Sequence, residues 1–244
     1  MKITFSNASL WKYTILGISK ILEEVAIKAD KDGIRLRAMD PSHVMLIDLF
    51  FPSSSFESYE ANSEIIGINL ENLSDMLKRA KKGDKLEIVT EGNKFQLKFI
   101  GKFSRIFTES TVDVPYQELP DINLEFKADI RLSAQIFKDS IEDVEFLGDN
   151  IYFIANESKF TILNESEIGK AIVELDKDSG NIISLVCEGE QKSLYGLEYL
   201  ESLLYSAEVA DIVSIQFSSG IPTKITFEFP QGARLVSYIA PREA

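Results

Sequence analysis

The sequence is short of the residues on which many catalytic and metal sites depend. It has one histidine, His43, and one cysteine, Cys187, among 244 residues. A lone cysteine forms no disulfide within the chain, which fits a reducing cytoplasm. No cysteine pair or histidine cluster is present to hold zinc. We therefore expect no metal and no other cofactor, and we interpret Cys187 as a small buried side chain.

Signatures of membrane proteins and of common enzymes are also missing. No apolar run approaches the roughly 18–20 residues of a membrane span, and the N-terminus lacks the apolar core of a signal peptide. We expect a cytoplasmic protein without a membrane partner. Gly101-Lys102 and Gly169-Lys170 lack the upstream glycine of a phosphate loop, and no GxSxG motif occurs. Because nothing supplies a base, an orienting group and an oxyanion site together, the sequence predicts that the chain is not an enzyme.

Basic residues are fewer than acidic residues, and the difference is larger in the second half of the chain. Residues 1–124 hold 16 Lys and Arg against 18 Asp and Glu, whereas residues 125–244 hold 10 against 21. A net charge of −13 argues against nucleic-acid binding, because phosphate contacts rest on basic side chains. Nucleic-acid binding is compatible with this net charge only if basic residues cluster on one part of the surface.

The chain contains an internal repeat. The stretch NLENLSDMLKRAKKGDKLEIV from Asn69 aligns with GLEYLESLLYSAEVADIVSIQ from Gly196 at a shift of 127 residues. Around Ile15 the shift is 126 residues. Such self-similarity predicts two copies of one unit. We expect an N-terminal domain over 1–110, an extended connector over 111–127 and a C-terminal domain over 128–244.

Each unit combines two helices with strands, which predicts an α+β fold. Four apolar stripes recur at steps of three and four residues. The stripes are Trp11, Ile15, Ile18 and Leu22; Leu70, Leu73, Leu77 and Ala80; Ile136, Ser140 and Val144; and Leu200, Leu203, Leu204 and Ala207. Alternating runs such as KLEIVTEG and KITFEFP predict strands between them. Asp30 and Asp32 beside Gly33 favour a hairpin turn over a calcium loop, because the other ligands of such a loop are missing.

Basic residues gather on the helices predicted in the first unit. They are Lys12, Lys20, Lys78, Arg79, Lys81 and Lys82. The helices of the second unit offer Lys138 alone, against six acidic residues. These acidic residues are Asp139, Glu142, Asp143, Glu198, Glu201 and Glu208. Such a basic patch is either a solvated helix face or a DNA contact, and charge alone leaves both interpretations open.

Several stretches resemble one protein family. LRAMDPSHVMLIDL, which contains His43, is similar to a signature of the proliferating cell nuclear antigen (PCNA) family of DNA sliding clamps, in its archaeal form. NLENLSDMLKRA, LSAQIFKDSIEDVEFLGDNI and the terminal RLVSYIAPRE resemble further parts of the family in the same order. The resemblance spans the whole chain.

The resemblance implies a fold and a function. Two similar domains would carry helices on the inside and antiparallel sheets on the outside, and three chains would close a ring with pseudo-six-fold symmetry. The ring would encircle duplex DNA without reading its sequence and would act as a processivity factor in DNA replication and repair. The basic helix residues and Lys138 would then face the phosphates. We expect location in the cytoplasm on the nucleoid, or in the nucleus if the source is eukaryotic.

The resemblance also implies a pocket on the front face of the ring, beside the connector, for the PIP box, a short hydrophobic and aromatic motif of partner proteins. Its walls would be Met39, His43, Val44, Leu46, Leu119, Pro120, Pro222, Tyr238, Ile239, Ala240 and Pro241. His43 would then be a wall of the pocket and not a catalyst. Buried aromatic anchors suit such an apolar pocket.

The implied partners are DNA polymerase, flap endonuclease, DNA ligase, a clamp loader and other clamp subunits. Because Asp139, Glu142 and Glu198 would line the hole in every copy, we expect a heterotrimer in preference to a homotrimer. Chains would join through strand edges near 104–112 and 170–177. Two alternatives stay open at this point: an interaction adaptor of the same fold with little DNA contact, and an unrecognised hydrolase.

Overall fold

The computed structural model describes residues 1–116 and 118–243, so Gln117 of the expected connector and Ala244 of the expected second domain lie outside the described residues. The first half runs β1 (Lys2–Phe5), α1 (Ala8–Ile18), β2 (Glu24–Asp30), β3 (Gly33–Met39), β4 (Met45–Pro52), β5 (Ser58–Glu60), β6 (Glu64–Asn69), α2 (Leu70–Leu77), β7 (Lys85–Glu91), β8 (Lys94–Ile100) and β9 (Ser104–Ser110).

The second half repeats this order of elements. It runs β10 (Ala128–Ser133), α3 (Ala134–Glu142), β11 (Asn150–Ala155), β12 (Lys159–Ser166), β13 (Gly169–Asp176), β14 (Ile182–Cys187), β15 (Gln191–Gly196), α4 (Leu197–Ala207), β16 (Ile212–Phe217), β17 (Thr223–Glu228) and β18 (Arg234–Ile239). Short 3₁₀ turns cover Ser53–Ser55, Glu145–Leu147 and Pro230–Gly232. The domain boundaries drawn from the sequence stay a prediction.

Equivalent hydrogen bonds show how closely the two halves correspond. The amide of Ala8 donates to the carbonyl of Asp84 at 2.9 Å, and Ala134 donates to Asp211 at 3.0 Å. These pairs are related by shifts of 126 and 127 residues, as in the sequence alignment. The repeat predicted from the sequence is therefore also a repeat of three-dimensional structure.

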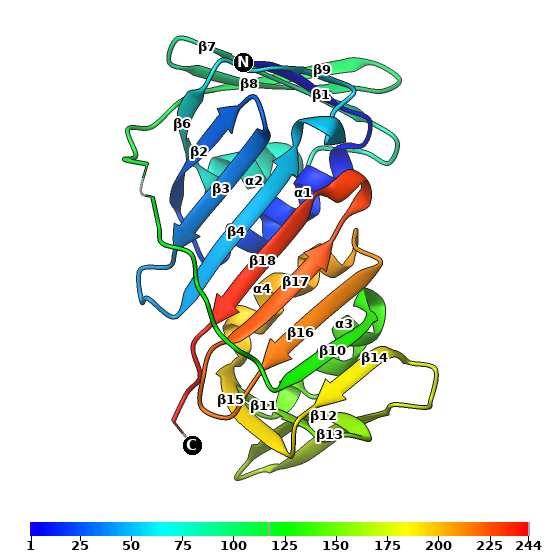
Figure 1. Ribbon diagram of the computed structural model, residues 1–244. Coiled ribbons are helices and arrows are strands. Elements are labelled where there is room, and N and C mark those ends of the chain that lie inside the picture. Colours follow the sequence, from blue (N-terminus) through cyan, green and yellow to red (C-terminus); the bar gives the residue numbers. More distant parts are fainter. Residues whose placement is uncertain (117, 244) are drawn as a thin grey trace.

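The chain forms three antiparallel sheets: the nine-stranded sheet lies in front of the four helices, and the other two sheets lie at the two ends of the molecule (Figure 1). The strand orders are β5-β1-β7-β8-β9, β14-β10-β16-β17-β18-β4-β3-β2-β6 and β13-β12-β11-β15. Pairing of β18 with β4 fuses a sheet of each half into the nine-stranded one. The equivalent strands, β9 and β13, stand at the edges of the other two sheets.

The helices end earlier than the apolar stripes predicted. Leu22, Ala80 and Val144 lie beyond α1, α2 and α3, where the chain closes each helix with a tighter i→i+3 bond, as from the Ala80 amide to the Leu77 carbonyl at 3.0 Å. Leu22 and Val144 are nevertheless buried, because the turn after each helix also packs on the core. In α3 the large side chains that are fully buried are Phe137 and Ile141, and Ile136 is only partly buried.

The two halves meet closely at the helix layer, where α1 packs against α4. A Cβ atom on Gly17 of α1 would stand 2.2 Å from the Ser202 carbonyl oxygen of α4, so glycine is needed for this approach. On the sheet side, the predicted hairpin turn at Asp30–Gly33 is confirmed by the pairing of β2 with β3. The Asp30 side chain caps that turn by accepting from the Asp32 amide at 2.9 Å.

Candidate DNA-facing surface and partner-binding face

Five of the basic candidates of the first half lie close to the end of α2. Four of them follow that helix directly, and the fifth, Lys12, lies on α1. Lys78 is the first residue after α2, and Arg79, Lys81 and Lys82 lie in the turn that leads to β7. The expectation that these residues lie on the helix is wrong, because α2 ends at Leu77. Lys20 also lies beyond its helix, since α1 ends at Ile18.

Lys12 on α1 comes together with Lys81 and Lys82 around one open hollow of about 840 Å³. The Lys12 ammonium lies 3.5 Å from the Ala80 carbonyl oxygen and over the ring of Tyr13. Lys81 lies over the ring of Phe103, 5.3 Å from its centroid. Three ammonium groups with few acidic neighbours form a site that attracts phosphate oxygens.

Lys138 on α3 differs from these residues because carboxylates of its own chain surround it. Its ammonium forms an ion pair with Glu208 and lies 3.7 Å from Glu142. The hydrogen bond to Glu208 raises the pKa of Lys138, so the charge is retained but is neutralised locally. Lys138 therefore has less capacity for a phosphate contact than Lys12.

Acidic residues of α3 and α4 are also partly engaged. Asp139 accepts a hydrogen bond from the Gln135 amide at 2.7 Å. Glu198 accepts from the guanidinium of Arg242 at 2.8 Å. Glu201 has no such partner among the described residues: burial and the carboxylates of Glu145, Glu198 and Asp149 raise its pKa. The second half thus presents a surface whose acidic groups are partly paired internally, but whose net charge stays negative.

On the outer face, three side chains expected in the partner pocket lie in one row across the nine-stranded sheet. Met39 of β3 pairs with Leu46 of β4, and Leu46 pairs with Tyr238 of β18. Leu46 is only 3 % exposed, although its neighbours Met45 and Ile47 are the residues of β4 that pack on the helix side. Burial raises the pKa of Tyr238. The row is an apolar strip in which Leu46 is buried and Met39 and Tyr238 are partly exposed.

The connector is held against this strip by Arg37 of β3. Its guanidinium donates to the Pro120 carbonyl at 2.7 Å and to the Asp121 carboxylate at 3.0 Å, and it lies 3.7 Å from Asp48. Leu119 and Met39 line the same hollow, of about 430 Å³. Figure 1 shows the connector crossing the outer face of the sheet on its way to β10.

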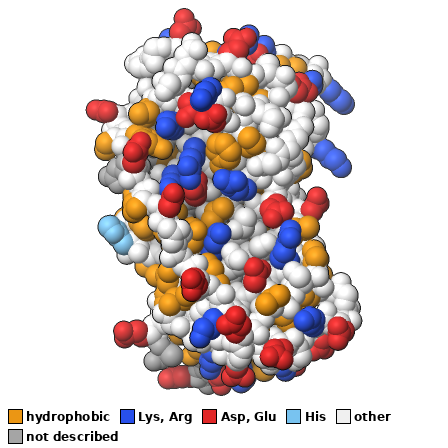
Figure 2. Space-filling view, viewed as in Figure 1, with side chains coloured by type: hydrophobic (Ala, Val, Ile, Leu, Met, Phe, Trp, Pro, Cys, Tyr) orange, Lys and Arg blue, Asp and Glu red, His pale blue; other side chains and the backbone are white. Residues whose placement is uncertain are grey.

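His43 lies at the tip of the β3–β4 turn, on the rim of the same hollow. Asp40 shapes this turn, since its carboxylate accepts from the amides of Ser42, Val44 and Met45 at 2.6–2.9 Å. His43 has a φ of 59° and is exposed. Figure 2 shows the single histidine projecting from the edge of the molecule, among mixed acidic, basic and hydrophobic side chains. Within residues 1–116 and 118–243, no group of three or more His, Cys, Asp or Glu could hold a metal ion.

Most of the other expected pocket residues lie in the C-terminal tail or contact it. The Ala240 amide donates to the Val44 carbonyl at 2.8 Å, and Pro241 lines a second hollow of about 660 Å³ with Tyr152 and Lys192. Pro222 lies in the turn between β16 and β17, half-buried. Ile239 does not line the outer face: it pairs with Met45 and is fully buried on the helix side. Strand alternation excludes it from a pocket that contains Tyr238.

Three residues that shape this face escaped the reading of the sequence: Arg37, Asp40 and Arg242. Arg37 and Arg242 act on chain segments more than 40 residues away, which no local pattern reveals. Asp40 was detectable, because Asp before Pro and Ser is a known turn signal.

Comparison with known proteins agrees with this architecture. The model of the PCNA N-terminal domain matches residues 1–126, and that of the PCNA C-terminal domain matches residues 119–242. The chain belongs to the proliferating cell nuclear antigen family. It is a DNA sliding clamp subunit, a scaffold and not an enzyme, and the adaptor alternative is not favoured.

Similar proteins cover the full length of the chain. The DNA polymerase sliding clamp of Pyrococcus furiosus is 34 % identical over 99 % of this chain and 98 % of that protein. DNA polymerase sliding clamp 3 of Aeropyrum pernix is 30 % identical over 98 % of this chain and 96 % of that protein. These matches agree with the archaeal type inferred from the sequence.

Two solved structures give the same result for the fold. The PCNA2–PCNA3 complex from Sulfolobus tokodaii has a TM-score of 0.93 at 31 % identity, and PCNA from Thermococcus kodakaraensis has 0.92 at 27 %. Each covers 99 % of both chains. The clamp fold expected from the sequence, with helices on one side and antiparallel sheets on the other, is confirmed. No helix among the described residues is long and apolar enough to cross a membrane.

Proposed function

We propose that this chain closes a three-subunit ring around duplex DNA by pairing its β9 edge with the β13 edge of the next chain. The observation that carries the proposal is the junction inside the chain. There, β18 pairs with β4, and β9 and β13 are the equivalents of these strands at the two free edges. A junction already built once within the chain supplies the template for the one between chains.

The internal junction also supplies a register. Val236 lies opposite Asp48, and the equivalent residues are Ile106 of β9 and Ile172 of β13. Ile106 and Ile172 are 56 % and 50 % exposed in the single chain, which is unusual for isoleucine on a strand. Pairing of the two edges would remove both side chains from water.

Inside the ring, we assign phosphate contacts to the basic residues of the first half. They are Lys12, Lys20, Lys78, Arg79, Lys81 and Lys82. The hollow shared by Lys12, Lys81 and Lys82 supports this assignment, and Lys138 contributes less because Glu208 and Glu142 engage it. Contacts of this kind hold DNA without reading its sequence and place the protein on the nucleoid.

On the outer face, we propose that the strip formed by Met39, Leu46 and Tyr238 binds PIP-box motifs, with the hollows at either end taking flanking residues. DNA polymerase, flap endonuclease, DNA ligase and a clamp loader are the proposed partners. The support is an apolar strip, half-buried before any partner arrives, between the connector and the C-terminal tail.

The proposed partner site predicts how substitutions at Tyr238 change the affinity for PIP-box peptides. Tyr238→Ala removes an aromatic surface near the centre of the strip, so PIP-box peptide affinity should fall by about 2 kcal/mol or more. Isothermal titration calorimetry measures the change. Tyr238→Phe, which keeps the ring, should bind within about 0.5 kcal/mol of the wild type. Wild-type affinity in the Ala variant would move the peptide site away from β18.

We further propose that the ring contains different subunits. The support is the net negative charge of α3 and α4, which neighbouring chains with more basic helices would offset. The solved PCNA2–PCNA3 complex from Sulfolobus tokodaii is an assembly of two distinct clamp chains. A stable trimer of this chain alone at micromolar concentration, seen by sedimentation, would contradict a mixed ring.

The experiment that tests the ring is retention on DNA of two topologies. Clamp subunits loaded on nicked circular DNA should survive a wash at high salt, whereas those on linear DNA of the same sequence should slide off. A topological link resists salt, whereas phosphate contacts weaken as salt rises. Equal loss from both DNAs would favour the adaptor interpretation over a closed ring.

A further inference from the structure

Glu109 is an acidic residue at an unusual place on the β9 edge. Along β9 the side chains of Arg105, Phe107 and Glu109 are partly buried, whereas Ile106 and Thr108 between them are exposed. Glu109 therefore points to the helix side of the sheet, where core residues belong. Its equivalent at the internal junction is Ile239, which is fully buried.

The carboxylate of Glu109 has no cationic partner among the described residues. Its Oε1 atom is buried and has no hydrogen-bond partner there. Burial raises the pKa of Glu109, and a hydrogen bond from the Asn72 side chain lowers it by less. Arg105, the basic residue on the same face of β9, already binds Asp84 and the Arg79 carbonyl. Apart from Asn72, the described residues of the chain thus provide no donor for Glu109, and they provide no cationic one.

A second copy of this chain would not provide that donor either. The internal register places Ile239 opposite Met45, and the equivalents at a self-junction are Glu109 and Gly169. Gly169 offers no side chain. The hairpin before it carries Glu165 and Glu167, and the nearest lysine, Lys170, alternates to the opposite face and lies 3.8 Å from Glu165.

We propose that Glu109 makes the β9 edge selective for a different clamp subunit, one that places a lysine or arginine beside it, over a second copy of this chain. The inference rests on the proposed β9–β13 junction and adds the chemistry of the partner. Ile106 stabilises a junction with any apolar edge, whereas a buried carboxylate discriminates among neighbours because leaving it unpaired is costly.

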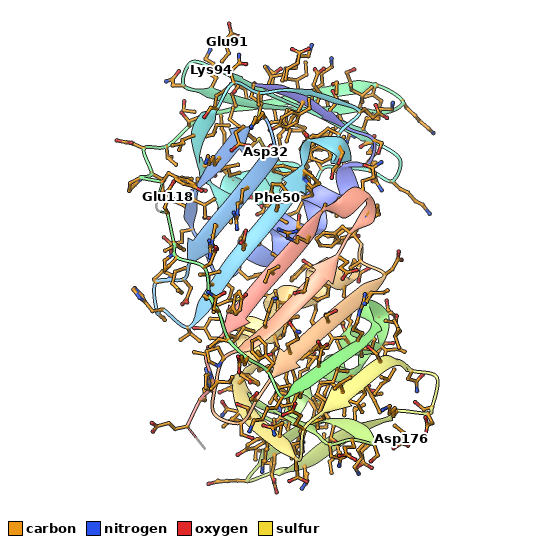
Figure 3. The ribbon with its side chains drawn as sticks, in the orientation of Figure 1. Asp32, Phe50, Glu91, Lys94, Glu118 and Asp176 are labelled. Atoms are coloured by element: carbon orange, nitrogen blue, oxygen red, sulfur yellow. The ribbon has the colours of Figure 1, made fainter. Side chains whose placement is uncertain are left out.

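The first test removes the charge. Glu109→Gln keeps the size of the side chain and should strengthen self-association of the chain at pH 7.5 about tenfold or more, measured by sedimentation equilibrium. Asp32→Asn is the matched control, because Asp32 is exposed in the turn between β2 and β3 (Figure 3), in a sheet that contains neither β9 nor β13. It should leave self-association unchanged. An unchanged constant for Glu109→Gln would overturn the proposal.

The second test supplies the missing cation. Ile168 is 79 % exposed in the turn before β13, outside the strand alternation that turns Lys170 away. Its equivalent Val44 packs against the core and accepts a hydrogen bond from Ala240, the residue after Ile239. Ile168→Lys should strengthen self-association about tenfold relative to Ile168→Gln, and this gain should vanish in the Glu109→Gln background. Equal constants for Lys and Gln at position 168 would contradict the proposed pairing.

These outcomes separate the selectivity of the edge from the ring itself. A wild-type chain that trimerises tightly and ignores both substitutions would retain the ring and refute the role of Glu109. Loss of the difference between circular and linear DNA would refute the ring, and with it the junction on which Glu109 acts.

Discussion

Replacement of Ile106 by Asp should abolish the salt-resistant retention of this clamp on circular DNA. The substitution places a charge at the centre of the β9 edge, where the register of the internal junction sets Ile106 opposite position 172 of the next chain, an isoleucine in this chain. Lost burial of one isoleucine costs about 1.5–3 kcal/mol, and a charge inside the contact costs more. We expect the junction to weaken about 100-fold or more, whatever the composition of the ring.

The fold offers a matched control for that experiment. Ile183 is 58 % exposed and lies on β14, which is also the edge of a sheet but has no part in the proposed junction. Ile183→Asp should therefore be retained on circular DNA like the wild type. Ile172→Asp changes the opposite edge and should behave like Ile106→Asp. Retention of both edge variants would exclude β9 and β13 as the strands that close the ring.

The sequence was sufficient to predict the repeat and the α+β class, because apolar periodicity is strong in all four helices. It did not predict where the helices end, because the stripe continues into the closing turn: Leu22 and Val144 are buried without being helical. It also placed Ile239 in the outer pocket, since a list of apolar residues near the C-terminus ignores the alternation of β18.

Contacts between distant segments were beyond any local pattern. Arg37 fixes the connector from 84 residues away, so the hollow that Leu119 and Met39 line depends on an interaction that only the folded chain reveals. The ion pair of Lys138 with Glu208, 70 residues apart, likewise changes the meaning of a lysine that the sequence offered as a phosphate contact. The residue type of Lys138 suggested a phosphate contact, and the carboxylate beside it argues against that role.

Replacement of Lys78, Arg79, Lys81 and Lys82 by Ala should flatten the salt dependence of DNA binding. Each phosphate contact contributes about 0.9 to the slope of log K against log salt. Loss of all four would therefore reduce the slope by about 3.6. Lys78 also binds Asp75 at 2.7 Å, so its share should be the smallest of the four. Fluorescence anisotropy over a range of salt concentrations measures the slope.

A variant with the same change in net charge separates contact from overall charge. Lys31, Lys94, Lys192 and Lys224 lie on strands and their turns, away from the helix layer. Replacing these four by Ala makes the chain equally more acidic, yet should leave the slope within about 1 of the wild type. If both quadruple variants flatten the slope equally, long-range charge governs binding and the turn after α2 has no special role. If only the first does, the acidic total of this clamp coexists with DNA binding because its basic residues are concentrated where the helices face the hole.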